Sequence, residues 1–252
     1  MSESGSQRQR VIAGAALVAA FIASRVLYDG AGIRLDAAAY PGYWQTIDTA
    51  LLRTDLWRSI FYLHTQPPLM NTAYGMLEAL PQSQRPVVMH GVYFFLGLAL
   101  AISMFQVAMA LRMAPWLAAA VAAWFSLSPG AILYEHVPAY AYPVMAALVV
   151  AAFCLYQFAV TGKPLWCTLF FVSVAGIALT WAFFHLVWVI AVSMLLLSNP
   201  HTRRTVVRTS ALPVLLVAGW YLKNLILFGA FSASSWMGMN LARIMVFPPC
   251  FS

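Results

Sequence analysis

Nine ionisable side chains lie near the ends of long apolar stretches or in the loop after the first of them, and these are the residues that could do chemistry. They are Asp29, Asp36, Asp48, His64, Glu78, Glu135, His136, His185 and Lys223. Ionisable residues that cannot reach bulk water are functional candidates in membranes, because burying a charge there is costly. Acids and histidines beside an apolar cavity suit general-base catalysis on a lipid-linked substrate. The same set, with its lysine, also suits recognition of a charged headgroup.

The composition of the chain places these residues in a membrane protein. Of the 252 residues, 63% are hydrophobic and 8% are charged, whereas soluble domains carry about 25% charged residues. These proportions exclude a soluble enzyme, a disordered protein and a secreted disulfide scaffold. The apolar runs are long and unbroken, which excludes a β-barrel. We therefore predict an all-α polytopic membrane protein.

Seven apolar runs are candidate membrane spans, because a span needs about 20 predominantly apolar residues. They cover residues 11–28, 87–111, 116–133, 140–160, 165–180, 183–198 and 211–228. The fifth and sixth are short and nearly contiguous, with a turn near Trp181 and Ala182. The chain is then one membrane domain, with a cytoplasmic tail (1–10), the first span (11–28), an external loop (29–86), six further spans (87–228) and an external tail (229–252).

The placement of lysine and arginine orients these spans. With the N-terminus in the cytoplasm, six of the seven acids fall outside, and the cytoplasmic side holds Arg8, Arg10, Arg112, Lys163, Arg203, Arg204 and Arg208. The scattered basic residues therefore orient spans and do not indicate nucleic-acid binding. We expect an integral protein of the bacterial cytoplasmic membrane whose active face is external.

The external loop 29–86 holds five of the seven acids and is rich in aromatic residues and leucine, so we expect it to be ordered. Apolar residues recur at helical spacing from Trp44 to Leu63, which predicts a helix lying in the membrane interface. A second helix is predicted to start at Pro67-Pro68 and to end before Pro81. It is placed outside the membrane, with a short span as the alternative.

Three stretches resemble glycosyltransferases of the GT-C superfamily, in the family 39 group that includes protein O-mannosyltransferases and aminoarabinose transferases. GIRLD (32–36) and LHTQPPLMN (63–71) are similar to that group's first external loop, where an acid follows the first span and a PPL motif comes later. SLSPGAILYEHVPAYAYP (126–143) resembles the junction of the third and fourth spans. WYLKNLILFGAFSASSWMGMNL (220–241) is similar to a stretch of bacterial members with an unassigned acceptor.

This resemblance implies transfer of a sugar from a polyprenyl-phosphate donor at the outer face of the membrane. An aspartate of the first loop would accept the acceptor's proton as the nucleophile attacks the anomeric carbon. Cationic groups would stabilise the departing lipid phosphate. By position Asp36 best matches that base, although Asp-Ala stands where the family often has Asp-Glu; Asp48 and Asp29 are the alternatives.

The other candidates each have a functional and a structural interpretation. Glu135 and His136 stand where the family has its second external acid, and they could hold the acceptor or a divalent cation; otherwise they are an exposed loop pair. His64 could bind phosphate or a metal, or cap the PPL helix. The candidates for binding the donor phosphate are Lys223, His185 and Arg243, and their alternatives are snorkelling and packing.

Two other function classes stay open. A transporter or lipid flippase would show inverted repeats, broken helices and charges near the middle of the bilayer, and no clear repeat is visible. Family members run well past a seven-span module, whereas about 24 residues follow the last span here. A catalytically inactive or split subunit that requires a second membrane protein is therefore the third expectation.

Overall fold

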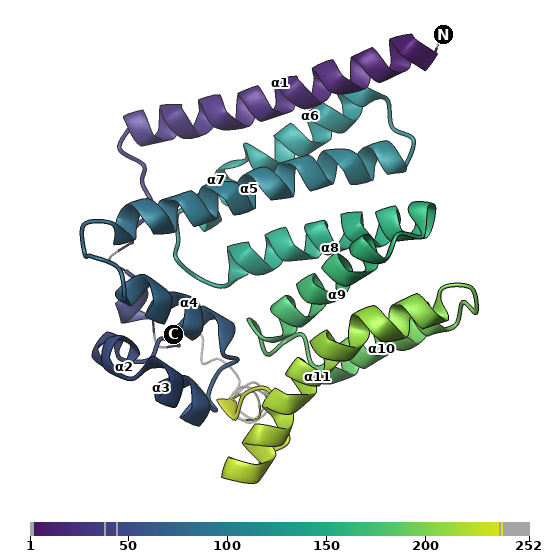
Figure 1. Ribbon diagram of the computed structural model, residues 1–252. Coiled ribbons are helices and arrows are strands. Elements are labelled where there is room, and N and C mark those ends of the chain that lie inside the picture. Colours follow the sequence, from purple (N-terminus) through teal and green to yellow (C-terminus); the bar gives the residue numbers. More distant parts are fainter. Residues whose placement is uncertain (1–2, 38, 44, 237, 239–252) are drawn as a thin grey trace, which may run out of the picture. The chain divides into compact units, whose positions relative to one another are not determined.

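The computed structural model describes residues 3–37, 39–43, 45–236 and 238, and these residues fold into helices joined by turns (Figure 1). No strand occurs within the described ranges. The prediction of an all-helical chain is confirmed at this level. The helices are α-helical apart from one short 3₁₀ turn, η1 (Tyr40–Gly42).

Four helices are long and apolar enough to cross a membrane. They are α1 (Glu3–Gly30), from Ser6 onward, α5 (Arg85–Ala110), α8 (Ala141–Thr161) and α11 (Arg203–Phe228). A fifth candidate is the bent pair of α6 (Pro115–Ser126) and α7 (Pro129–Glu135), whose axes differ by 57°. The described chain therefore has four to five candidate spans, consistent with an integral membrane protein.

Two further apolar helices are shorter. α9 (Pro164–Ala178) has 15 residues and α10 (Leu186–Leu197) has 12. At about 1.5 Å rise per residue they extend roughly 22 and 18 Å, against a hydrocarbon thickness of about 30 Å. They coincide with the predicted fifth and sixth spans, so the count of seven spans stays a prediction.

The break between α6 and α7 has a local cause. α6 ends at Ser126, and Ser128 takes an extended conformation before Pro129. The Ser128 hydroxyl accepts a hydrogen bond from the Ala131 backbone N–H, at 3.2 Å, and so caps the new helix. Proline suits the first turn of a helix, where its missing N–H would have no helical partner. The sequence SLSP therefore ends one helix and starts another.

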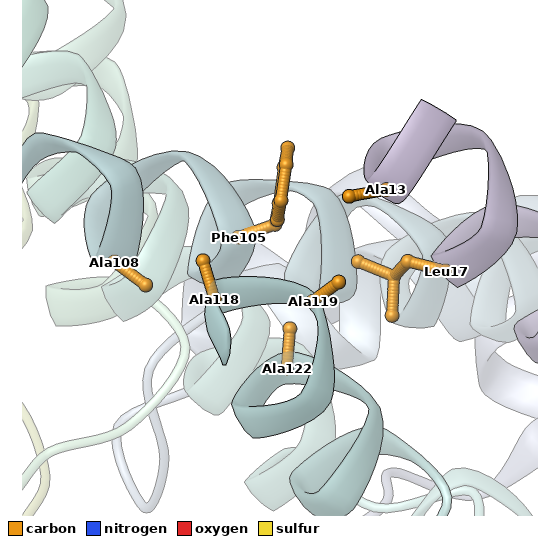
Figure 2. Packing of buried hydrophobic residues seen from close by; sticks show 7 residues of the cluster. All are labelled: Ala13, Leu17, Phe105, Ala108, Ala118, Ala119 and Ala122. Carbon is orange, nitrogen blue, oxygen red and sulfur yellow. The ribbon is translucent and has the colours of Figure 1, made fainter. Parts of the chain in front are cut away.

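The chain divides into two compact units. Unit 1 comprises Met1–Tyr40 and Leu80–Phe170, and unit 2 comprises Pro41–Ala79 and Phe171–Ser252. The core of unit 1 joins α1, α5 and α6, and its side chains are mostly small (Figure 2): Ala13, Leu17, Phe105, Ala108, Ala118, Ala119 and Ala122. Small side chains let helix backbones approach closely in membranes.

Unit 2 contains the predicted loop helices, and their arrangement differs in part from the prediction. Two short helices, α2 (Thr49–Thr54) and α3 (Leu56–Tyr62), stand where one interfacial helix was predicted over 44–63. Asp48 caps α2 by accepting from the Ala50 N–H at 2.8 Å, and Asp55 takes an extended φ of −147° between the helices. The apolar spacing continues through this break, so periodicity alone did not reveal it.

The second predicted loop helix agrees with the structure. α4 (Leu69–Glu78) starts directly after Pro68 and ends three residues before Pro81. Asn71, Tyr74 and Glu78 share the face that is buried in unit 2.

Candidate functional site

A buried ion pair lies inside unit 1. The Arg25 guanidinium of α1 contacts the Glu135 carboxylate at the end of α7, with Nε 3.2 Å from both carboxylate oxygens and Nη2 bonded to Oε2. Both side chains are 3% exposed. The Tyr142 hydroxyl of α8 donates to Glu135 Oε2 at 2.8 Å, so three helices meet at one carboxylate. A buried charge requires such pairing, because desolvation is otherwise too costly.

The remaining surroundings of Arg25 complete this cluster. Its Nη1 donates to the Ser126 carbonyl at 2.9 Å and to the Ser24 hydroxyl at 3.0 Å. Its guanidinium carbon lies 3.8 Å from the centre of the Phe21 ring, a cation–π contact. Gly97 of α5 makes room for the cluster, since a Cβ there would lie 2.5 Å from the Tyr142 hydroxyl oxygen and 3.1 Å from Glu135 Oε2.

Arg25 is the residue that the search for chemistry along the sequence missed. It lies within the first apolar run, residues 11–28. An arginine inside a candidate span is itself a signal, because ionisable residues there face a partner or a water-filled cavity. Its partner, 110 residues further along the chain, has no local signature.

Glu135 is therefore a buried residue, and the interpretation of an exposed loop pair does not hold for it. Its two carboxylate oxygens are occupied by Arg25 and Tyr142. A cation or an acceptor at Glu135 would have to compete with these contacts. His136 follows it as the C-cap of α7, is half-buried, and has Nδ1 2.7 Å from the Ile132 carbonyl.

Asp36 lies near this cluster in unit 1. Its backbone N–H donates to the His136 carbonyl at 3.3 Å, which fixes the first-loop acid beside the α7–α8 turn. Asp36 is exposed. The neighbouring His136 ring has its centre 6.4 Å from that of His90. The structure thus brings together Asp36, Glu135 and His136, three of the predicted site residues.

The other two aspartates considered as the base have structural partners. Asp29 is exposed and pairs with Arg34 at 2.7 Å. Asp48 is exposed in unit 2 and caps α2.

Unit 2 contains an apolar pocket of about 390 Å³ with one cation in its wall. Lys223 of α11 supplies that cation, and the apolar wall is formed by Trp57, Ile60, Phe61, Leu179, Leu216 and Trp220. The Lys223 ammonium lies 3.5 Å from the centre of the Trp220 ring and donates to the Leu63 carbonyl. An ammonium has three N–H donors, so this contact leaves donors for an anion.

His64 directly follows Leu63, whose carbonyl accepts from the Lys223 ammonium. Its Nδ1 is 3.0 Å from the Ser235 hydroxyl, and its ring centre is 4.4 Å from that of Phe228. The Ser235 N–H also donates to the His64 carbonyl at 2.9 Å. These contacts fasten the segment after α11 to the loop that carries the PPL motif, so His64 has a structural role here.

The two remaining candidates for the donor phosphate fall elsewhere. His185 caps α10 by accepting weakly from the Val187 N–H at 3.4 Å, and its ring centre lies 5.1 Å from that of Tyr221. Arg243 lies outside the described residues.

Buried polar contacts also hold the loop helices of unit 2 together. Asn71 accepts from the Ile47 N–H at 2.8 Å and donates to the Gln45 carbonyl at 3.0 Å. Glu78 pairs with Arg53 at 3.3 Å. Asn71 and Glu78 therefore hold α4 against the segment 45–53, which is a structural role.

The described His, Cys, Asp and Glu side chains form no group of three or more that could hold a metal ion. The divalent cation expected from the sequence stays a prediction.

Comparison of the chain with protein-family models, with curated proteins and with solved structures finds no match.

Proposed function

We propose that this protein is a membrane glycosyltransferase that moves a sugar from a polyprenyl-phosphate donor to an acceptor. The observation that carries the proposal is the apolar pocket of unit 2 with Lys223 in its wall. A lipid phosphate needs an apolar surface for its chain and a cation for its headgroup, and this pocket supplies both. The partly desolvated ammonium attracts an anion more strongly than an exposed one, because the local dielectric constant is lower.

The proposed chemistry is a direct displacement at the anomeric carbon of the donor sugar. In unit 1, the Asp36 carboxylate accepts the proton of the acceptor hydroxyl as that oxygen bonds to the anomeric carbon. The bond between the anomeric carbon and the phosphate oxygen breaks, and the polyprenyl phosphate leaves with the negative charge. Lys223 is the cation proposed to bind the lipid phosphate of the donor.

The proposal includes the finer topology expected from the sequence. The N-terminus is cytoplasmic, the loop 29–86 is external, and α9 and α10 are short crossings accommodated by local thinning of the bilayer. The active face is then the outer face of a bacterial cytoplasmic membrane.

A transfer assay tests this function. Proteoliposomes and native membranes would be supplied with polyprenyl-phosphate donors carrying a labelled hexose or pentose, and labelled product would be counted. Asp36→Asn should lower transfer by at least about 100-fold, the smallest effect expected for loss of a general base.

The matched control is Asp55→Asn, an exposed acid whose side chain pairs with Arg58 at 3.9 Å. It should transfer like the wild type. Equal activity of Asp36→Asn and wild type would remove Asp36 as the base, and absence of transfer from every donor would contradict the function.

A second candidate, a transporter or lipid flippase, is favoured by one observation. The bent pair α6 and α7 next to the buried Arg25–Glu135 pair resembles the broken helices and buried charges of transporters. Substrate flux in proteoliposomes without any covalent product would select this function.

A further inference from the structure

A groove of about 410 Å³ lies between α1 and α5 in unit 1. The α1 side of this groove is a helical stripe, because its residues recur at spacings of three and four. The apolar part of the wall is formed by Val11, Gly14, Leu17, Val18, Ile102 and Phe105. Glycine at position 14 leaves room for the Phe105 ring in this wall, since a Cβ there would lie 3.3 Å from that ring.

One end of the groove is polar and basic. Arg10 lines it together with Gln7 and Gln106, and the Arg10 guanidinium donates to Gln106 Oε1 on the facing helix. This bond holds the guanidinium across the mouth of the groove. A guanidinium has five N–H donors, so further donors remain for a phosphate oxygen. None of the residues lining the groove is acidic.

Two more arginines lie at the same end of unit 1. α1 and α5 are antiparallel, because Arg10 meets Gln106 while Phe21 meets Gly97. Arg8 at the start of α1 and Arg112, two residues past the end of α5, therefore belong to the end that carries Arg10. Anionic headgroups are attracted to such clusters of arginine next to a span.

We propose that this groove is a binding site for an anionic phospholipid. Both helices that form it are candidate spans, and Val11 and Ala15 of its wall are exposed, so lipid can reach the groove. An acyl chain lies along the apolar stripe, and the headgroup phosphate is bound by Arg10, with Arg8 and Arg112 adding to the positive field. The site is independent of the proposed transfer reaction and of the Lys223 pocket.

Native mass spectrometry of the purified full chain in neutral detergent tests the site. The probes are phosphatidylglycerol, phosphatidylcholine with the same acyl chains, and inorganic phosphate. Wild type should bind phosphatidylglycerol at least about fivefold more tightly than phosphatidylcholine. Arg10→Gln should weaken phosphatidylglycerol binding roughly fivefold, the effect of one arginine near an anionic lipid surface, and leave phosphatidylcholine binding unchanged.

Two further variants complete the experiment. Arg204→Gln removes an exposed arginine from the start of α11 in unit 2, and it should bind both lipids like the wild type. Ala15→Trp places a large ring on an exposed position of the groove, and it should weaken binding of both lipids. Equal binding of the two lipids by wild type, an unchanged preference in Arg10→Gln, or full competition by inorganic phosphate would overturn the lipid site.

Discussion

Arg25 shows most clearly how a single residue shapes this protein. Its charge is buried in a candidate span, the Glu135 carboxylate of another helix compensates for it, and Tyr142 of a third helix donates to that carboxylate. The sequence alone supports the inference that an arginine in an apolar run needs a partner. It does not identify that partner, because helical periodicity reports which face of a helix is buried and not which distant residue meets it.

Breaking the Arg25–Glu135 pair should strongly destabilise the protein. Arg25→Met leaves the Glu135 carboxylate buried without its cation, and we expect a loss of about 3–5 kcal/mol in the free energy of unfolding. The double variant Arg25→Met/Glu135→Leu should recover most of this loss, because no unpaired charge remains. Unfolding in detergent, followed by circular dichroism, measures both.

The exposed pair Arg34–Asp29 provides the control for that measurement. Its side chains are 70% and 50% exposed, so Arg34→Met should change stability by less than about 1 kcal/mol. If Arg25→Met were as stable as Arg34→Met, the buried pair would not have the structural role described here.

Among the elements, those with local signals could be predicted and those that depend on distant contacts could not. α4 was predicted because Pro67-Pro68 and Pro81 bracket it. The break between α2 and α3 was missed because Asp55 lies off the apolar stripe. The spacing of the apolar residues is the same whether the helix continues through Asp55 or is interrupted there. The closeness of Asp36 to His136 was also beyond prediction from spacing, because 100 residues separate them.

The close packing of α5 against α1 and α8 gives a prediction about glycine. Gly97→Ala places a Cβ 2.5 Å from the Tyr142 hydroxyl oxygen and 2.9 Å from Phe21. Such overpacking costs about 1–3 kcal/mol, so the thermal midpoint should fall.

Gly91→Ala in the same helix is the matched control, because a Cβ there meets nothing within 4 Å. It should be no less stable than wild type, since alanine favours a helix more than glycine does. Similar losses in both variants would mean that the helix, and not the packing at Gly97, is sensitive to the substitution.

For the whole molecule, the composition predicted an all-α membrane protein. The number of membrane crossings is seven in the prediction, and four to five helices or helix pairs of the described chain are long enough to span. Seven crossings place the turn between α9 and α10 on the external side of the membrane. Five crossings, with α9 and α10 not spanning, place it in the cytoplasm, opposite the external loop. The hydrogen bond from the Leu69 N–H of that loop to the Leu179 carbonyl, at 3.0 Å, disfavours this second topology. Phe183 lies in this turn and is 75% exposed, so it is a suitable position for a label.

A cysteine at Phe183 separates these two topologies. In a background with Cys154, Cys167 and Cys250 replaced by alanine, Phe183→Cys should react with a membrane-impermeant maleimide added to intact spheroplasts. Lys163→Cys should react only after the membrane is opened, because both topologies place it in the cytoplasm. Protection of Phe183→Cys in intact spheroplasts would exclude seven crossings.

The proposed function depends on binding of a lipid phosphate in the Lys223 pocket. Binding of polyprenyl phosphate to the purified chain tests this most directly. We predict that wild type binds it, that Lys223→Met weakens binding roughly tenfold, as expected for loss of a charged hydrogen bond, and that Lys163→Met binds it like wild type. Failure of wild type to bind, or equal binding by Lys223→Met, would contradict the account.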